Sequence, residues 1–308
     1  MNETHETIEV NDPELLRVVA ADARLERICT GFGFSEGPIW NPKEQCLYFS
    51  DMPQDIRRRW TARDGVFEVR HPSNKCNGMT YDAAGNLYVC EHITSSLIRE
   101  TPAGGREVLA SHWQGKRLNS PNDVVVRADG TVYFTDPTYG RMPVFGLERM
   151  QELEFQGVYR LSRDRRLYCE AYDFSQPNGL CLSPDERTLF VNDTTRARIH
   201  AFDVAPNGSL SRGRVFAQQI GSGDYAEGVV DGMKCDELGN VYVTGPRGIW
   251  VFNRKGRHLG VIRMPEVAGN MNWGGSDWRD LYCCCSTSIY RVRMQVAGSP
   301  AAYMRMVG

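Results

Sequence analysis

Six residues that carry a carboxylate or an amide recur along the 308-residue chain, at intervals of 41, 45, 56, 53 and 41 residues. Each begins a short strand-like run, which reaches a turn and then a second run rich in Val, Tyr, Phe and Leu. Five of the six are followed directly by Gly or Asp. The recurring residues are Glu36, Asn77, Asn122, Asn178, Asp231 and Asn272. Side-chain oxygens that meet at one point are the ligands that hard divalent cations prefer.

The spacing of these residues predicts how they are brought together. Self-similarity on a scale of roughly 40 to 55 residues is typical of β-propellers and related arrays. Each repeat holds a hairpin signature, such as Ala84-Gly85-Asn86 or Leu238-Gly239-Asn240, between two apolar runs. Four antiparallel strands in each of six repeats predict an all-β, six-bladed propeller whose equivalent residues point to a central axis. Because the repeats cover nearly the whole chain, we expect one domain over residues 1–308.

A central metal site follows from this arrangement. The four strongest candidates for its ligands are Glu36, Asn122, Asn178 and Asp231. Two carboxylates that meet in one cavity repel each other, and a divalent cation removes that cost. Ligation by oxygen alone favours Ca²⁺, Mg²⁺ or Mn²⁺ over thiophilic metals. We expect one divalent cation, with Ca²⁺ as the first candidate and Mg²⁺, Mn²⁺, Zn²⁺ or Fe²⁺ as alternatives.

Asn77 and Asn272 are expected at the edge of the same site, where they reach it through water or hydrogen-bond its ligands. Trp273, next to Asn272, is expected to wall the pocket. The competing interpretation is that these Asn and Asp residues only begin strands, as ordinary turn residues do. It fits Glu36 least, because Glu does not favour turns.

The composition excludes several classes of partner. The net charge is −2 with mixed signs, so no electrostatic field attracts nucleic acid or an anionic membrane. No apolar run approaches the roughly 18 residues of a membrane span, and the polar N-terminus lacks the layout of a signal peptide. We therefore expect a cytoplasmic protein with neither partner, while its oligomeric state stays open. The ten cysteines lack zinc-site spacing and are expected to be reduced structural thiols.

Other segments are expected to build the rim of the propeller. An insertion near 139–156 in the third repeat is either a lid over the pocket or a loop with no role. A short helix is expected within 13–23. The segments 1–24 and 295–308 are expected to help close the ring, but nothing indicates which terminus supplies the closing strand.

Four stretches carry specific motifs: GFSEGPIW, KRLNSPNDVVVRADGTVYFTDPTYG, PNGLCLSPDERTLFVND and DGMKCDELGNVYVT. They resemble the bacterial branch of the gluconolactonase, regucalcin and senescence-marker-protein family, and the resemblance runs from about residue 25 to 290. It implies a six-bladed propeller that hydrolyses sugar lactones, with one divalent cation in its central channel. The implied ligands are Glu36, Asn178 and Asp231, with Asn122 as a fourth ligand or a substrate contact. The Asp is also the implied general base.

The chain departs from this family pattern at one position. Animal members carry an Arg two residues before the Asn that matches Asn122, and this Arg contacts the sugar. Here that position is Ser120. Other groups must then bind the substrate, a small-molecule lactone. The candidates, beside Asn122, are Asn119, Glu91, His92 and Tyr139; a structural His92 is the alternative for that residue.

The chemistry predicted for this site is attack of water on a lactone carbonyl that the cation polarises. The sequence leaves open whether Asp231 takes the proton from water or whether the cation lowers the pKa of water directly. A phosphotriesterase or aryl-ester hydrolase with the same cation is one alternative, which a pocket lined by Met, Phe and Trp would favour. A propeller that serves as a binding module, with a structural ion, is another.

Overall fold

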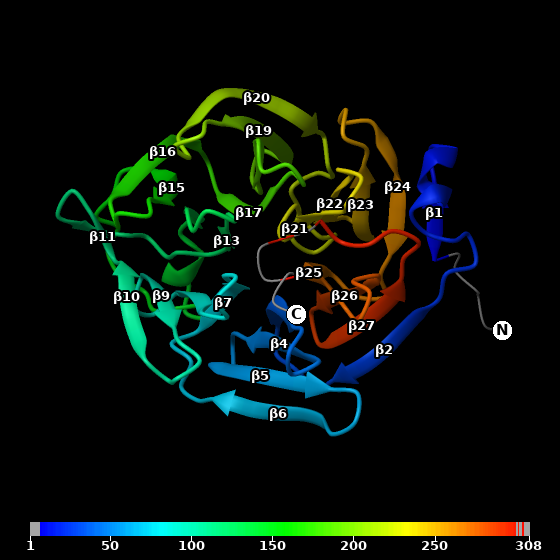
Figure 1. Cartoon of the computed structure of the whole chain (residues 1–308), viewed down its shortest axis with the longest axis horizontal. Helices are drawn as coiled ribbons and strands as arrows, with labels where there is room; N and C mark the ends of the chain where they lie inside the picture. Colours follow the sequence, from blue (N-terminus) through cyan, green and yellow to red (C-terminus); the bar gives the residue numbers. More distant parts are fainter. Residues whose placement is uncertain (1–6, 300, 302–303, 305–308) are drawn as a thin grey trace.

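The computed structural model describes residues 7–299, 301 and 304. The described chain is almost entirely β-structure, and its sheets are arranged as six blades around a central axis (Figure 1). Its helical segments are two short 3₁₀ turns, η1 (Pro13–Arg17) and η2 (Tyr139–Arg141). The all-β, six-bladed propeller predicted from the repeats is confirmed.

Four blades are built from consecutive antiparallel strands. The first contains β3 (Ser35–Asn41), β4 (Cys46–Asp51), β5 (Ile56–Thr61) and β6 (Gly65–Arg70). The second contains β7 (Cys76–Tyr81), β8 (Leu87–Glu91), β9 (Ser96–Glu100) and β10 (Arg106–Ala110). The third contains β13 (Val124–Val126), β14 (Val132–Asp136), β15 (Gln156–Leu161) and β16 (Leu167–Phe174). The fourth contains β17 (Pro177–Leu182), β18 (Thr188–Asp193), β19 (Arg198–Val204) and β20 (Leu210–Gln218).

The last two blades borrow strands from the N-terminal segment, which therefore closes the ring. The fifth blade contains β21 (Met233–Cys235), β22 (Val241–Gly245), β23 (Gly248–Phe252), β24 (His258–Arg263) and, beside β24, β1 (Ile8–Val10). The sixth contains β25 (Ala268–Gly274), β26 (Asp280–Cys285), β27 (Ser288–Arg293) and, as its outermost strand, β2 (Leu25–Thr30). A separate hairpin joins β11 (His112–Trp113) to β12 (Lys116–Arg117). The sequence could not indicate that closure would come from the N-terminal side.

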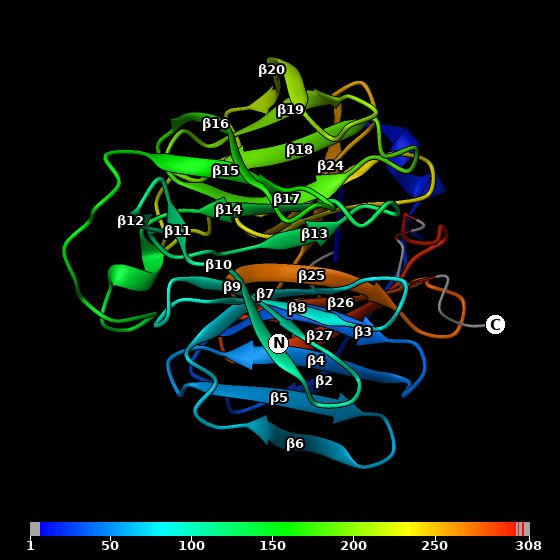
Figure 2. The same cartoon turned by 60° about the vertical axis from the view of Figure 1, so that its left-hand side comes forward.

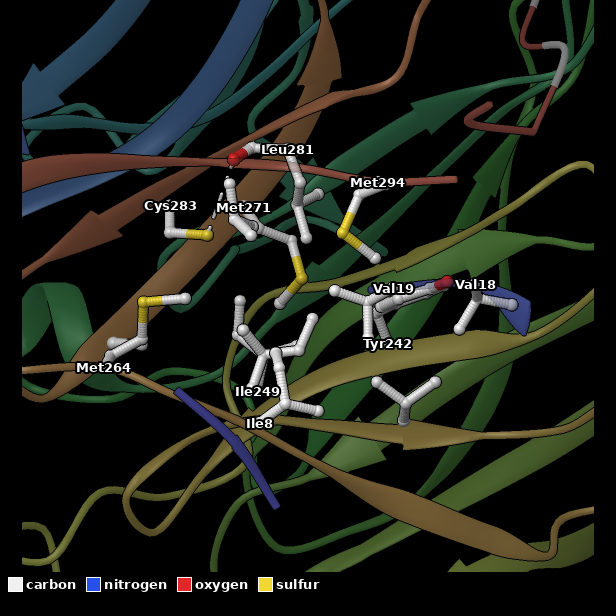
Figure 3. Close-up of a cluster of buried hydrophobic side chains, with 14 of the residues drawn as sticks. Ile8, Val18, Val19, Tyr242, Ile249, Met264, Met271, Leu281, Cys283 and Met294 are labelled. Carbon is white, nitrogen blue, oxygen red and sulfur yellow. Dashed lines mark hydrogen bonds between the residues drawn. The ribbon is translucent and has the colours of Figure 1, made fainter. Parts of the chain in front are cut away.

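The N-terminal segment is held by apolar packing between the fifth and sixth blades (Figure 3). Val18 and Val19, just after η1, are buried in one cluster with Tyr242 of β22 and Met271 of β25. The expected helix within 13–23 is thus only one 3₁₀ turn, and burial of the valines that follow it fixes the segment.

The adjacent cysteines of β26 pack on opposite sides of the strand, as the alternation of a strand requires. Cys283 and Cys285 belong to the cluster of Figure 3, whereas Cys284 faces Trp40 and Tyr282. All ten cysteines are free, in agreement with the prediction that they are structural thiols.

The contact between the first and sixth blades is the one that ring closure must make. Trp40 of β3 is 4 % exposed and stacks on Tyr282 of β26, with ring centroids 5.2 Å apart and an interplanar angle of 10°. A Cβ on Gly274 of β25 would lie 2.8 Å from the Trp40 ring, so this position leaves no room for a side chain.

Trp40→Ala is expected to lower the free energy of unfolding by about 3–5 kcal/mol, because it removes a large buried ring and leaves a cavity at the closing contact. Urea unfolding followed by fluorescence and circular dichroism measures this change. Met150→Ala is the control: Met150 is 88 % exposed, so a change within about 0.5 kcal/mol is expected. Equal stability of Trp40→Ala and the wild type would contradict the importance of this contact.

Candidate active site

A cavity of about 390 Å³ opens at one end of the central channel. Its floor consists of the residues at the inner ends of the six blades. In the first five blades these are Glu36, Asn77, Asn122, Asn178 and Asp231, and in the sixth blade Ala268, next to the equivalent Gly269, lines the cavity. The structure therefore brings the four predicted ligands together, with Asn77 beside them.

The sixth repeat begins at Gly269, three residues before Asn272: the backbone N–H of Gly232 donates to the carbonyl oxygen of Gly269, as that of Gly78 donates to the carbonyl oxygen of the opener Asn122. Asn272 lies inside β25, and with Trp273 it lines a separate hollow at the opposite end of the channel. The predictions that Asn272 reaches the metal site and that Trp273 walls the pocket are wrong. A β-bulge between Ala268 and Asn270 shifts the register here. The apolar residue two positions after each of the other openers marks the correct position, because Met271 stands two positions after Gly269.

Small residues follow the openers because neighbouring inner strands approach each other closely. A Cβ on Gly37 would lie 1.9 Å from the carbonyl oxygen of Asn77, and one on Gly179 would lie 2.0 Å from that of Asp231. The inner strands of the first, second and fourth blades also carry β-bulges at this place. Bulges re-aim side chains, and here they accompany the turn of each opener toward the axis.

Hydrogen bonds fix the orientation of the ring amides. Asn77 donates from Nδ2 to Asn122 Oδ1 at 2.8 Å, and Asn122 donates from Nδ2 to Asn178 Oδ1 at 2.6 Å. Asn178 in turn donates from Nδ2 to Thr194 Oγ1 at 3.1 Å. Each amide oxygen keeps a second lone pair, so the ring can still offer oxygen to a cation.

Glu36 has one occupied and one free oxygen. Its Oε2 accepts hydrogen bonds from the backbone N–H of Gly37 at 2.6 Å and from Asn270 Nδ2 at 2.9 Å. Its Oε1 is buried and has no hydrogen-bond partner within the described part of the chain. Burial raises the pKa of Glu36, and burial together with the charge of Glu36 raises the pKa of Asp231 well above its ordinary value. The charge of Lys234 opposes the rise at Glu36, but neither carboxylate forms an ion pair within the described part of the chain.

The ionisable groups around the ring carry a net negative charge. Burial also raises the pKa of Asp123, a third buried carboxyl, and the charge of Lys234 opposes that rise. When ionised, Glu36, Asp123 and Asp231 carry three negative charges and Lys234 carries one positive charge, which leaves −2. A divalent cation would neutralise the channel.

The donor set also fits such an ion. Residues 7–299, with 301 and 304, contain no group of three or more His, Cys, Asp or Glu side chains arranged to hold a metal. A cation in this cavity would therefore depend on two carboxylates supplemented by neutral amides. Oxygen-only ligation of this kind suits Ca²⁺, Mg²⁺ or Mn²⁺.

His92 and Tyr139, two of the predicted substrate contacts, line the cavity. His92 Nδ1 lies 2.8 Å from the carbonyl oxygen of Phe145, which can only accept, so Nδ1 carries the proton. Its Nε2 lies 3.2 Å from Asn122 Oδ1. Burial lowers the pKa of His92 to about 4, so the ring is neutral at pH 7 and has a single N–H. With that proton on Nδ1, Nε2 is an acceptor and makes no hydrogen bond to Asn122 Oδ1, which is an acceptor too. Tyr139 Oη lies 3.3 Å from Tyr225 Oη.

Glu91 and Asn119, the other two predicted contacts, do not line the cavity. Glu91 forms an ion pair with Arg106 and accepts a hydrogen bond from Asn74. Consecutive residues of an extended chain face opposite sides, so Glu91 points away where His92 points in. Asn119 donates from Nδ2 to the carbonyl oxygens of Asp136 and Phe155 and thereby holds together the two ends of the segment between β14 and β15.

The insertion after β14 forms one wall of the cavity. Figure 2 shows this loop, in green, projecting on one side of the propeller. Lys75 Nζ donates to the carbonyl oxygen of Val144 at 2.8 Å, and Arg149 Nη2 donates to that of His92 at 3.1 Å. These contacts, with the His92–Phe145 bond, hold the loop against the ring. The prediction of a loop beside the pocket is confirmed, while its motion stays untested.

The sequence did not identify the apolar residues of the cavity wall. They are Phe34, Met52, Met142, Phe145, Val229 and Val267, together with Tyr225, whose ring is apolar and whose hydroxyl is polar. Phe34 and Phe145 pack edge to face, with ring centroids 5.5 Å apart. Phe34, Val229 and Val267 each stand two positions before an opener, and that position is the signal that could have found them.

Comparison with known proteins agrees with this geometry. Residues 34–287 match the family described as SMP-30/Gluconolactonase/LRE-like region. A gluconolactonase of Zymomonas mobilis is 32 % identical over 306 residues, covering 93 % of this chain and 85 % of that protein. The structure of a gluconolactonase from Xanthomonas campestris, 31 % identical, superposes with a TM-score of 0.85 over 94 % of this chain and 96 % of that one.

A more distant relative is a pentonolactonase of Haloferax volcanii, 24 % identical and covering 86 % of this chain and 83 % of that protein. The described residues include no helix with the length and apolar character needed to cross a membrane. The family model spans most of the chain, and the two gluconolactonases cover nearly all of it. The chain therefore belongs to the SMP-30/gluconolactonase family.

Proposed function

We propose that the protein hydrolyses a sugar lactone of the gluconolactone type to the open-chain aldonic acid. The observation that carries this proposal is the cavity floor, where the buried Glu36 Oε1 has no partner in the described chain. A divalent cation, with Ca²⁺ as the first candidate, would be held there by Glu36, Asn122, Asn178 and Asp231. The Zymomonas mobilis and Xanthomonas campestris relatives are gluconolactonases, which supports the same reaction class.

The two ring carboxylates have different roles in this proposal. When bound, the cation supplies Lewis-acid polarisation of the lactone carbonyl and a lowered pKa for water. Glu36 is fixed by two hydrogen bonds to Oε2 and is nearly fully buried, so it serves in binding. Asp231 is partly exposed to the cavity, so it is placed to take a proton from the attacking water.

The proposed reaction is an ordinary hydrolysis of the lactone ester bond. Water forms a bond to the carbonyl carbon while Asp231 accepts its proton. The ring C–O bond then breaks, and Asp231 returns the proton to the departing alkoxide oxygen. His92, neutral and with Nε2 as an acceptor, can receive a hydrogen bond from a substrate hydroxyl at the cavity floor.

Asp231→Asn is expected to lower kcat/KM by about 10²–10⁴-fold, because it removes the group that accepts the proton. Glu36→Gln is expected to lose most activity and also to bind Ca²⁺ more weakly. Opening of D-glucono-1,5-lactone, followed with a pH indicator and corrected for spontaneous opening, measures turnover, and calorimetry measures Ca²⁺ affinity. Asp164→Asn makes the same chemical change on an exposed turn and should leave both values unchanged. Full activity of Asp231→Asn would contradict the assignment.

Removal of divalent cations with a chelator is expected to abolish turnover and to lower the melting temperature. Refilling with Ca²⁺ at a hundred times its Kd should restore turnover and stabilise the fold by about 2.7 kcal/mol, because the cation binds the native state alone. Mg²⁺, Mn²⁺ and Zn²⁺ are compared in the same assay. Undiminished turnover of protein shown by elemental analysis to be free of metal would exclude the metal-dependent mechanism.

A second candidate function is hydrolysis of an aryl ester or a phosphotriester at the same site. The observation that favours it is the apolar wall, because substrate hydroxyls packed there would lose about 1–3 kcal/mol each for want of partners. Ser120 stands where the animal members of the family carry the Arg that contacts the sugar. It does not line the cavity, and its hydroxyl donates to the carbonyl oxygen of Pro137. A diisopropyl-fluorophosphatase of Loligo vulgaris is 26 % identical, over 56 % of this chain and 56 % of that protein.

Phe145→Ser separates the two candidates. An aryl substrate that packs on this ring should lose about tenfold or more in kcat/KM, since burial of an aromatic side chain contributes about 1.5–3 kcal/mol. Gluconolactone should change less than threefold. The measurement is hydrolysis of phenyl acetate and of gluconolactone by the same preparations, with the exposed Met150→Ala as control. An equal or larger loss with gluconolactone would contradict this role of the Phe145 ring, and no turnover of either substrate by the wild type would favour a binding module.

A further inference from the structure

Asn270 of β25 is a buried polar residue that the sequence did not single out, because the sixth repeat was expected to begin at Asn272 and begins at Gly269. Its side chain is 3 % exposed and lies within the channel below Ala268. Asn270 Nδ2 donates to Glu36 Oε2 at 2.9 Å. This bond joins the sixth blade to the first, directly beneath the cavity floor.

The amide of Asn270 has one orientation that satisfies its neighbours. Its Oδ1 accepts a hydrogen bond from the backbone N–H of Met271 at 2.8 Å. That contact leaves the NH₂ group to face the carboxylate. A flipped amide would place Oδ1 against Glu36 Oε2, which can only accept, and both hydrogen bonds would be lost.

Two glycines leave the space that this arrangement of Asn270 and Glu36 needs. A Cβ on Gly232, the residue after Asp231, would lie 2.1 Å from Asn270 Oδ1. A Cβ on Gly269 would lie 2.8 Å from Glu36 Oε1. Neither glycine has a left-handed φ, so space rather than backbone conformation is what these positions require. The two glycines let the amide and the carboxylate meet in the channel.

We propose that Asn270 is a positioning residue that fixes the Glu36 carboxylate with Oε1 free to bind the divalent cation. Two donors, the Gly37 N–H and Asn270 Nδ2, occupy Oε2, and Oε1 is the oxygen left without a partner in the described chain. The inference rests on the proposed function, because it assigns Asn270 a task toward the same cation. Asn270 acts through Glu36 and touches neither substrate nor reacting atoms.

The energetic expectation follows from the behaviour of outer-sphere partners of metal ligands. Loss of such a partner typically costs about 10–100-fold in metal affinity. Without Asn270 the Glu36 carboxylate can rotate about its Cγ–Cδ bond. Cation binding must then itself fix the two oxygens, and the free energy of binding becomes less favourable. A purely structural Asn270, which only braces the bulge of β25, would leave the cation affinity of the folded protein unchanged.

The test is Ca²⁺ titration of the full chain carrying Asn270→Leu or Asn270→Ala, by calorimetry at 25 °C. Leu keeps the volume of the side chain and Ala removes it, and both remove the donor. Each variant is expected to raise the Kd by about 10–100-fold. Asn272→Leu, in the same strand at the opposite end of the channel, is the matched control and should keep the wild-type Kd. If one Asn270 variant does not fold, the other is measured.

A second readout separates positioning from structure. The melting temperature of each variant is measured in chelator and in saturating Ca²⁺. A structural role lowers both temperatures equally, whereas a positioning role reduces the increase that a fixed Ca²⁺ concentration produces. A wild-type Kd and a wild-type increase in both Asn270 variants would overturn the inference and leave the proposed function standing. Absence of Ca²⁺, Mg²⁺, Mn²⁺ and Zn²⁺ binding by the wild type would overturn both.

Discussion

The carboxylates of Glu36 and Asp231 meet in a cavity that is largely withdrawn from water, and each raises the cost of ionising the other. Such a pair is stable only if the surrounding structure supplies compensating charge or hydrogen bonds. The neighbouring groups follow from this constraint. The remaining oxygen-bearing openers are neutral amides that bond to one another, and the charge of Lys234 partly offsets those of Asp123 and Glu36. The residual charge of −2 matches one divalent ion.

Closure of the ring is what makes the repulsion unavoidable. Glu36 lies on the first blade and Asp231 on the fifth, and the sixth blade between them contributes Ala268, which has no ligating atom. One sector of the floor is therefore free of side-chain oxygen, as a catalytic ion with open positions requires. The sixth blade is completed by β2 from the N-terminal segment, so the site depends on a strand more than 200 residues away from β25 in the chain.

The repeats made the fold and most of the floor predictable, because the same residue types recur wherever the same position faces the axis. The sixth opener, Gly269, has no side-chain oxygen, so a pattern of recurring oxygen ligands could not indicate it. Glu91 was chosen together with its neighbour His92, although only one of two consecutive strand residues can face the cavity. The wall was unpredictable for another reason: Met142 and Phe145 lie on a non-repeating insertion, whose position depends on tertiary contacts such as Lys75 with Val144.

Chemistry and substrate choice thus reside in different parts of the chain. The ring is built by the repeats and sets the charge, whereas the insertion contributes Tyr139, Met142 and Phe145 to the wall above it. Opening of a lactone creates a carboxylate that was absent from the substrate. If one divalent cation neutralises the channel, as we propose, this new charge would also face the carboxylates of Glu36 and Asp231. The apolar wall of Phe34 and Phe145 cannot solvate it either. Electrostatics therefore favour departure of the product over its retention.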